Sequence, residues 1–206
     1  MDKDKQIWIF AGPNGSGKST IMDNYIREGL CSANLICPDN FVKIEDRSSG
    51  SAYLEAAHKA EIRRSYEITM GHSFTFETVL SRREKLEFIR YAKAKGYFIN
   101  IIYVSTEKAD INIARVKMRV EQGGHDVPEK NIRRRYLRCM HLLPFVTELA
   151  DDVEIYDNSG ETYRLVAKKI NKIYFLSLNT PKWVKFSLLE ATNAFKENVF
   201  RISDFL

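Results

Sequence analysis

A glycine-rich segment, "AGPNGSGKST" at residues 11–20, limits the possible folds of this chain more than any other part of the sequence. An apolar run, "QIWIF", comes directly before it, and a stretch with helical periodicity, "IMDNYIREGL", comes directly after it. Glycines, a lysine and a hydroxyl at this spacing, between a strand and a helix, form a P-loop for a nucleoside triphosphate. The residues expected to hold the phosphates are Gly12, Asn14, Gly15, Ser16, Gly17, Lys18, Ser19 and Thr20.

The chemistry expected of this loop depends on bare backbone. Consecutive N–H groups at positions without side chains can turn inward and form a nest for an anion. The helix that begins near Lys18 adds its unpaired amides and the positive end of its dipole. We expect Lys18 to reach the β- and γ-phosphates of ATP, and the Ser19 hydroxyl to bind Mg²⁺. The alternative is a glycine-rich turn that binds nothing.

Strand-like and helix-like segments alternate along most of the chain. The predicted strands are residues 6–11, 34–39, 73–79, 97–104 and 153–158, and the predicted helices are 18–29, 51–70, 81–96, 106–122 and 129–149. Such alternation favours right-handed βαβ units and a parallel sheet covered on both faces. The sequence therefore predicts an α/β fold, the three-layer sandwich of P-loop NTPases, with a mostly parallel central sheet and a helical lid.

The end of the chain has a different pattern. Residues 173–186, "IYFLSLNTPKWVKF", predict two short strands around an Asn-Thr-Pro turn, and residues 187–200 predict a closing helix. We therefore expect a P-loop kinase domain over residues 1–172 and a hairpin-and-helix extension over 173–206. The extension is expected to pack on the core and not to form a second domain.

Composition sets weaker limits. The net charge of +5 and a pI near 9.0 favour anionic partners, although a mildly basic solvated surface would give the same values. Three cysteines without C-x-x-C spacing argue against a disulfide framework and favour a reducing compartment. No stretch approaches the roughly 18 apolar residues of a membrane span. We expect a cytoplasmic protein with no membrane partner.

Asp39 is the candidate catalytic base. It ends the predicted strand 34–39 and comes 21 residues after Lys18 (39 − 18). Ligands of open α/β sheets bind outside the carboxyl ends of the strands, so Asp39 is expected to share a cleft with the P-loop. A carboxylate there could accept the proton of an attacking hydroxyl. Capping of the next helix, or binding of the metal through water, are the alternatives.

Glu77 and Thr78 end the third predicted strand, in "FTFETVLS", on the same rim of the sheet. A carboxylate beside a hydroxyl suits a polyol substrate, because both can form hydrogen bonds with sugar hydroxyls. Glu77 could instead help to order Mg²⁺, since the usual strand-end aspartate of P-loop proteins is missing where "INIIYVS" continues into Thr106. A purely structural role is the third interpretation.

An arginine-rich segment occupies residues 114–140, "ARVKMRVEQGGHDVPEKNIRRRYLRCM". Arg115 and Arg119 are four residues apart and lie on one helical face. The loop around His125, which follows two glycines and precedes a proline, is predicted to be a hinged lid. Planar guanidinium groups suit the oxygens of a transferring phosphoryl group, so we expect at least one catalytic arginine here. Arg119 is the first candidate, followed by Arg134 or Arg135, and a solvated charged face is the alternative.

Taken together, these motifs resemble the zeta toxin family of P-loop kinases. The resemblance lies in "GPNGSGKST", in the aspartate of "CPDNF", in "FETVLS" and in "RVKMRVEQGGHDVPEKNIRRRYLR", and covers about residues 6–160. It implies a phosphotransferase that uses ATP and Mg²⁺, with Asp39 as the base, Glu77 and Thr78 at the sugar substrate, and lid arginines on the phosphate. Toxins of this family phosphorylate UDP-N-acetylglucosamine and are inhibited by an antitoxin. The compact chain and its "RRRYLR" helix also resemble stand-alone zeta-like ATPases, so the antitoxin is left open.

Three functions remain in competition at this point. The first is a kinase that moves the γ-phosphate of ATP to a hydroxyl of a small molecule. The second is a polynucleotide or RNA-end kinase, which the basic balance favours but the lack of an aromatic-interleaved basic groove disfavours. The third is a nucleotide-binding ATPase module that acts through a protein partner. Only the first requires Asp39 as a base and a small acceptor.

Overall fold

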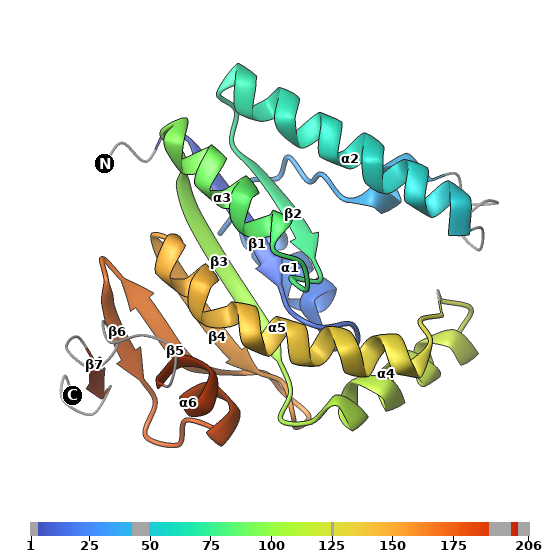
Figure 1. Cartoon of the computed structure of the whole chain (residues 1–206), viewed down its shortest axis with the longest axis vertical. Helices are drawn as coiled ribbons and strands as arrows, with labels where there is room; N and C mark the ends of the chain where they lie inside the picture. The colour runs from blue at the N-terminus through green and yellow to red at the C-terminus, as the bar shows by residue number, and fades with distance from the viewer. Residues whose placement is uncertain (1–3, 43–49, 125, 190–198, 202–206) are drawn as a thin grey trace.

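The computed structural model describes residues 4–42, 50–124, 126–189 and 199–201, with the backbone alone at residues 39, 50, 53, 189 and 199–201. Helices pack against a single sheet of seven strands (Figure 1). The strands are β1 (Gln6–Ala11), β2 (Phe74–Thr78), β3 (Phe98–Ser105), β4 (Asp152–Asp157), β5 (Arg164–Ile170), β6 (Ile173–Leu176) and β7 (Val199–Arg201). The helices are α1 (Lys18–Arg27), α2 (Gly50–Met70), α3 (Glu84–Ala94), α4 (Ala109–Glu121), α5 (Glu129–Leu149) and α6 (Lys182–Leu189), with a short 3₁₀ turn, η1 (Pro38–Phe41).

The order of strands places the P-loop near the middle of the parallel part of the sheet. The order is β2-β1-β3-β4-β5-β6-β7, and the first four strands are parallel. Ile9 of β1 pairs with Phe76 on one side and Ile101 on the other. Strand β5 is antiparallel to both of its neighbours, and β7 is parallel to β6. The predicted α/β fold with a mostly parallel sheet is therefore confirmed.

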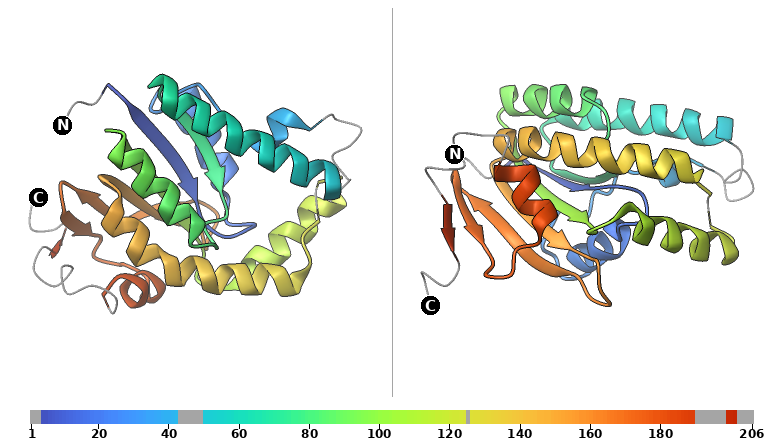
Figure 2. Two further views of the ribbon diagram at one scale, coloured as in Figure 1. Left: turned by 45° about the horizontal axis from the view of Figure 1, so that its top comes forward. Right: turned by 60° about the horizontal axis from the view of Figure 1, so that its bottom comes forward.

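Helices α4 and α5 form an antiparallel hairpin beyond the carboxyl ends of the strands (Figure 2). Gly123, which has φ of +84°, ends α4, and Pro128 precedes α5. A small apolar cluster that includes Val116 and Ile132 holds the two helices together. The predicted helices of this segment are confirmed, and His125 of the predicted lid loop lies outside the described residues.

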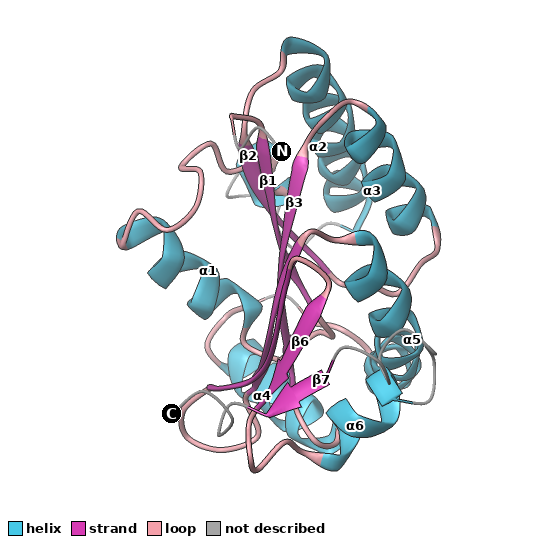
Figure 3. Ribbon diagram, turned by 90° about the vertical axis from the view of Figure 1, so that its left-hand side faces the viewer, coloured by secondary structure: helices cyan, strands magenta, loops and turns pink. Residues whose placement is uncertain are grey.

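The sheet separates two apolar layers. In the edge view, α1 lies on one side of the sheet, whereas α2, α3, α5 and α6 lie on the other (Figure 3). Successive residues of a strand point to opposite faces, so Phe10 packs with Ile21 of α1 and Ile9 packs in the larger core with Leu143 of α5. Burial of each such side chain contributes about 1.5–3 kcal/mol.

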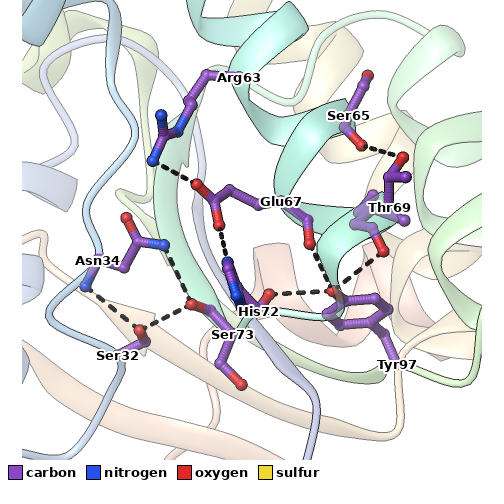
Figure 4. A network of polar contacts seen from close by, with 10 residues as sticks. Ser32, Asn34, Arg63, Ser65, Glu67, Thr69, His72, Ser73 and Tyr97 are labelled. Carbon is purple, nitrogen blue, oxygen red and sulfur yellow. Dashed lines mark hydrogen bonds and ion pairs between the residues drawn. The ribbon is translucent and has the colours of Figure 1, made fainter.

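The predicted strand at residues 34–39 is wrong, because the segment pairs with β2 at one position only. Leu35 forms an isolated parallel bridge with Thr75, and hydrogen bonds from Ser32 and Asn34 to the carbonyl of Ser73 hold the segment there (Figure 4). Pro38 then starts η1, and proline has no N–H to continue a ladder. Asp39 consequently lies in a 3₁₀ turn and not at the end of a strand.

The C-terminal prediction is partly wrong. A hairpin does exist, but it consists of β5 and β6, and the sequence had not predicted β5. The sequence predicted the end of a strand and the start of a helix over residues 182–189, but these residues form α6. The reason is that Pro181 begins a helix here and not a hairpin turn. The predicted helix 187–200 ends at residue 189 in the described part, residues 190–198 lie outside it, and Val199 belongs to β7. The proposed boundary at residue 172 falls between β5 and β6, and the division into a core and an extension remains a prediction.

Lys169 connects β5 to the end of α5. Its buried ammonium donates hydrogen bonds to the carbonyls of Thr147 and Ala150, both at 2.6 Å, and of Glu148 at 3.2 Å. These carbonyls belong to the last turn of α5, which leaves its acceptors unpaired and carries the negative end of the helix dipole. Burial lowers the pKa of Lys169 to about 8. The lysine therefore fixes the antiparallel strands to the helix that carries the arginines.

Candidate active site

The P-loop turns between β1 and α1 with its backbone pressed against neighbouring strand ends. Gly12 has φ of +143°, and a Cβ atom on it would lie 2.0 Å from the carbonyl oxygen of Val104 in β3. Gly17, at φ of +94°, precedes α1, and a Cβ atom there would lie 2.4 Å from Nδ2 of Asn158. Glycine is required at both positions by conformation and by space.

Asn158, directly after β4, supports the loop from one side. Its Nδ2 donates a hydrogen bond to the carbonyl of Ser16 at 2.8 Å, and its own carbonyl accepts one from Nη1 of Arg115 at 2.8 Å. Arg115 also donates to the carbonyl of Gly160 at 3.1 Å. The sequence predicted that Arg115 shares a helical face with Arg119. In the structure, Arg115 binds the backbone on either side of Ser159 and so supports Asn158. Sequence reasoning missed Asn158, whose contact with the loop joins residues 142 positions apart.

Glu77 faces the two functional side chains at the start of α1. Its Oε2 accepts a hydrogen bond from Ser19 Oγ at 2.6 Å, and its Oε1 lies 3.6 Å from Nζ of Lys18. Lys18 is only 4% exposed and also donates to the carbonyl of Pro13 at 2.9 Å. The structure thus brings together three residues that the sequence predicted separately: the P-loop lysine, its serine and the strand-end carboxylate.

The donor set of Ser19 and Glu77 fits a magnesium ion. Both groups supply hard oxygen ligands, and Mg²⁺ usually binds one or two carboxylates together with phosphate oxygens. Within the described residues, no group of three or more His, Cys, Asp or Glu side chains forms an all-protein metal site. A metal at this place would therefore depend on the nucleotide for its remaining ligands.

The usual strand-end aspartate has no counterpart among the neighbours of the P-loop that the structure describes. Ser105 ends β3, Thr106 follows it, and both are buried. Asp157, at the end of β4, is a buried carboxylate, but it is already bound by Arg164 at 3.0 Å, by Ser159 at 2.6 Å and by Trp183 at 3.2 Å. The Asp157 carboxylate is therefore already paired, and among the described carboxylates Glu77 is the one in contact with Lys18 and Ser19.

Arg135 is the arginine of α5 that contacts the P-loop. Its Nη1 donates a hydrogen bond to Oδ1 of Asn14 at 3.1 Å. Burial lowers its pKa, and the positive charges of Arg134 and Arg82 lower it further, but a guanidinium stays charged in proteins. Cys139, one turn further along α5, is buried, and burial raises its pKa to about 12 in spite of the nearby charges of Lys18 and Arg135.

The other candidate arginines lie elsewhere. Arg134 is exposed and donates to Oδ1 of Asn131 at 3.0 Å. Arg133 binds Glu129 at 2.8 Å and Asp110 at 2.7 Å. Arg119 lies in the last turn of α4, one turn beyond Arg115, and packs against Gly124. The choice of Arg119 and Arg134 as catalytic residues remains a prediction.

The sequence predicts the acceptor on the side of the site that contains η1, the end of β2 and the inner face of α2, and this side is called the acceptor side below. The backbone of Asp39 lies in η1, and its side chain is outside the description. Thr78 ends β2 opposite Ala11, the residue before the loop. Thr20 lies exposed on α1. These positions do not test the roles predicted for Asp39 as a base and for Thr78 in substrate binding, and both roles remain predictions.

Arg64 is a buried charge on this side that sequence reasoning missed. It is 6% exposed and lies among the inward positions of α2, where its neighbours four residues before and after are Ala60 and Ile68. Its Cζ lies 4.9 Å from the ring centroid of Phe76, and its Nη1 donates to the carbonyl of Ile36 at 3.4 Å. The only sign in the sequence is an arginine within an otherwise apolar row at four-residue spacing.

The charge of Arg64 has weak compensation. Among the described side chains, its closest carboxylate is Glu61 at 3.9 Å, which is itself 57% exposed and closer to Lys85, at 2.9 Å. Burial lowers the pKa of Arg64, and only Glu61 and Cys37 act against this. The contacts of this buried guanidinium with the described residues are therefore long, at 3.4 Å and 3.9 Å.

The family model of the zeta toxin matches residues 1–169. The chain belongs to the zeta toxin family. An uncharacterized protein of Haemophilus influenzae is 27% identical over 139 residues, which cover 64% of this chain and 98% of that protein. Family membership and fold make the chain a kinase-like phosphotransferase that binds nucleotide.

Two solved structures share the fold of this zeta toxin family member. A chain of the AvrRxo1-ORF1:-ORF2 complex with ATP superposes with a TM-score of 0.70 at 14% identity, over 92% of this chain and 65% of that one. A chain of the PezAT toxin-antitoxin system of Streptococcus pneumoniae gives 0.56 at 16% identity, over 79% and 72%. No helix within the described residues is long and apolar enough to cross a membrane.

Proposed function

We propose that this zeta toxin family member is a kinase that transfers the γ-phosphate of Mg²⁺-bound ATP to a hydroxyl of a small molecule. The observation that carries the proposal is the position of Glu77, whose carboxylate lies 2.6 Å from Ser19 Oγ and 3.6 Å from Lys18 Nζ. The same pair of P-loop groups contacts metal and phosphates in nucleotide kinases. A carboxylate placed against them can hold the metal or orient the acceptor.

The nucleotide is assigned to the loop between β1 and α1. The backbone amides at the start of α1 would receive the phosphates, and Lys18 would leave the carbonyl of Pro13 to bind their oxygens. Ser19 and Glu77 are the residues that would hold Mg²⁺, which neutralises charge on the phosphates when it is bound. Ser16 supports this assignment, because its buried hydroxyl has no hydrogen-bond partner among the described residues.

Asp39 is assigned the role of general base. Its backbone lies in η1, directly after the segment that pairs with β2 beside Glu77. The carboxylate would take the proton of the acceptor hydroxyl as that oxygen attacks the γ-phosphorus. The bond from the γ-phosphorus to its bridging oxygen breaks, and ADP leaves.

The arginines of the α4–α5 hairpin are assigned to the transferring phosphoryl group. Arg135 is favoured, because its guanidinium already reaches Asn14 of the P-loop. Arg119 and Arg134 remain candidates from the sequence, and each lies on the same hairpin. A guanidinium that approaches the γ-phosphate stabilises charge that develops in the transition state.

The acceptor is proposed to carry a negative charge. Arg64 lies beside Phe76, the residue before Glu77, and its polar contacts with the described residues are long, at 3.4 Å and 3.9 Å. A UDP-amino sugar joins a diphosphate to a sugar whose hydroxyls suit Glu77 and Thr78. It is therefore the first acceptor to test.

One labelling experiment tests the proposal. The protein is incubated with γ-labelled ATP and Mg²⁺ in the presence of UDP-sugars, neutral sugars, other metabolites or oligonucleotides, and the labelled product is identified. We expect label on a small anionic acceptor. Asp39→Asn should abolish transfer but leave ATP affinity unchanged, and transfer by this variant at the wild-type rate would disprove the assignment of the base. Label on oligonucleotides, or ATP hydrolysis without any acceptor, would favour the competing functions.

A protein partner is a further part of the proposal, because PezAT is a toxin-antitoxin system. Growth of a bacterial host that expresses the chain alone tests it. If the acceptor is a cell-wall precursor, growth should stop, and Asp39→Asn should restore it. Normal growth with active protein in the cells would speak against a toxin.

A further inference from the structure

A buried contact joins the middle of the P-loop to the first turn of α4. Gly15 has φ of +73°, and a Cβ atom on it would lie 2.4 Å from the carbonyl oxygen of Asn112 and 3.0 Å from Cγ2 of Val116. Only a residue without a side chain fits between the loop and the helix at this point. The P-loop therefore packs directly against the helical hairpin that carries the candidate arginines.

Asn112 connects this contact to β3 and α5. The residue is fully buried, and its Oδ1 accepts a hydrogen bond from the hydroxyl of Thr106, the residue after β3. The hydroxyl of Tyr136 on α5 donates to the carbonyl of Thr106 at 2.8 Å. Tyr136 follows Arg135, whose guanidinium contacts Asn14 of the P-loop at 3.1 Å. A set of polar contacts thus runs from the first turn of α4 through Thr106 to α5 and back to the loop.

One end of the Asn112 side chain is unpaired in this arrangement. Its Nδ2 is buried and has no hydrogen-bond partner among the described residues. The hydroxyl of Ser16, the residue after Gly15, is buried without a described partner as well. A buried donor that has lost water and gained no protein partner lowers the stability of the fold. Unpaired polar groups therefore lie on both residues next to the contact, Ser16 in the loop and Asn112 in the helix.

We propose that Asn112 is a positioning residue for the nucleotide, with a buried amide that is unpaired before the nucleotide binds and pairs with the P-loop backbone when the phosphates arrive. Phosphates draw the N–H groups of the loop inward, so the carbonyls between these groups reorient and one of them accepts the Asn112 amide. The new hydrogen bond fixes α4, and with it the arginines of the hairpin, against the loaded loop. The inference rests on the nucleotide site of the proposed function and not on the acceptor.

A purely structural role does not explain this asparagine. An apolar side chain of the same size would fill the space under the loop without an unpaired amide. The hydroxyl of Thr106 does not depend on Asn112 either, because it also donates to the carbonyl of Lys108 at 3.0 Å. The amide therefore lowers stability where it stands, and a gain on nucleotide binding accounts for its presence.

Asn112→Leu tests the inference, because it removes the amide and keeps about the same shape. In calorimetry of the full chain, the Kd for ATP should rise about tenfold, the value of one hydrogen bond. In thermal unfolding without nucleotide, Tm should stay the same or rise by up to about 4 °C, because the variant buries no unpaired amide. An ATP affinity within a factor of two of wild type would overturn the inference.

Asn100→Leu is the matched control. Asn100 lies near the start of β3, is 5% exposed, and its Nδ2 donates to Oε1 of Gln6 at 3.2 Å. Its amide is thus already paired without nucleotide. Asn100→Leu should lower Tm by about 2–4 °C and leave the Kd for ATP unchanged, the opposite pattern to Asn112→Leu. The same changes of Tm and Kd in both variants would show that Asn112 is only structural.

A second variant and a second measurement cover the case in which leucine does not fit beside Val116. Asn112→Ala cannot crowd the loop and should weaken ATP binding by the same factor. In NMR of the wild-type chain, the NH₂ group of Asn112 should exchange with water at least about tenfold more slowly with ATP than without it, and that of Asn100 should change less. Equal slowing of both groups would overturn the inference. A wild-type chain that binds no ATP would disprove the proposed nucleotide site, and this inference with it.

Discussion

Close packing holds the P-loop on several sides, whereas longer contacts hold the acceptor side of the site. The carbonyl of Val104 lies directly beneath Gly12, and Asn158 and Arg135 each donate a hydrogen bond to the loop. On the acceptor side, the contacts of Arg64 with the Ile36 carbonyl and with Glu61 measure 3.4 and 3.9 Å. The comparison indicates that the P-loop is held by close packing before any nucleotide binds, and we expect that a bound acceptor would complete the contacts on the other side.

The largest effect is expected from Gly12→Ala, which disturbs the close packing of the P-loop. A Cβ atom 2.0 Å from the Val104 carbonyl must displace backbone, and φ of +143° is unfavourable for alanine. We expect a loss of more than about 3 kcal/mol in the free energy of unfolding and no measurable ATP binding. Urea unfolding and calorimetry measure the two effects.

Gly29→Ala is the control for Gly12→Ala. Gly29 has φ of +67° with nothing within 4 Å of the added atom, so only the backbone cost of about 1–2 kcal/mol should appear. ATP affinity should be unchanged. Equal effects of the two substitutions would show that the packing under Gly12 is not what makes glycine necessary.

The next largest effect is expected on kcat, and it should differ between Arg135 and Arg134. Arg135→Met should lower kcat by about 100-fold or more, because it removes a guanidinium beside the γ-phosphate position. Arg134→Met should change kcat by less than about threefold, since its charge is exposed and bound to Asn131. If steady-state kinetics instead show a larger loss of kcat for Arg134→Met than for Arg135→Met, Arg134 is the catalytic arginine, as the sequence predicted.

Arg64→Met sharpens the comparison on the acceptor side. It should raise KM for an anionic acceptor about 10- to 100-fold, the value of a charge-assisted hydrogen bond of about 1.5–3 kcal/mol. KM for ATP should not change. The free energy of unfolding should not fall either, because the closest described carboxylate lies 3.9 Å from this buried guanidinium. A variant that loses stability but keeps its KM for the acceptor would mean that Arg64 is only structural.

The smallest expected effect belongs to Asn158→Ala. This change removes the hydrogen bond to the Ser16 carbonyl and leaves space beside Gly17. We expect ATP affinity to fall about tenfold, as the loss of one hydrogen bond of about 1–1.5 kcal/mol implies. Affinity within a factor of two of wild type would show that the other contacts suffice to hold the loop.

Local sequence signals predicted the nucleotide side well. Residues 12–19 carry their own motif, β3 is mostly apolar, and Glu77 lies near the end of a strand of clear alternation. Each of these signals lies within a short segment, so no knowledge of the fold was needed. The structure brings two of these predictions together, because Glu77 contacts Lys18 and Ser19 of the P-loop.

Tertiary contacts decided what the sequence did not predict. Asn158 and Arg64 act on partners far along the chain, and nothing next to them in sequence marks that role. The apolar residues of 34–39 also fit a strand, but Pro38 and the Asn40 side chain, which accepts the Cys37 N–H at 3.1 Å, start a turn instead. In the C-terminal segment, the apolar pattern around Trp183 is compatible with strand and helix alike.

The ion pair of Glu77 with Lys18 has a consequence for the resting protein. A phosphate ion from the surroundings can reach the lysine only by separating two opposite charges that already neutralise each other. An ATP molecule with a bound cation would meet no such obstacle, since Glu77 and Ser19 are the groups that would hold the cation, which would leave Lys18 for the phosphates. Free phosphate should therefore compete poorly with metal-loaded nucleotide.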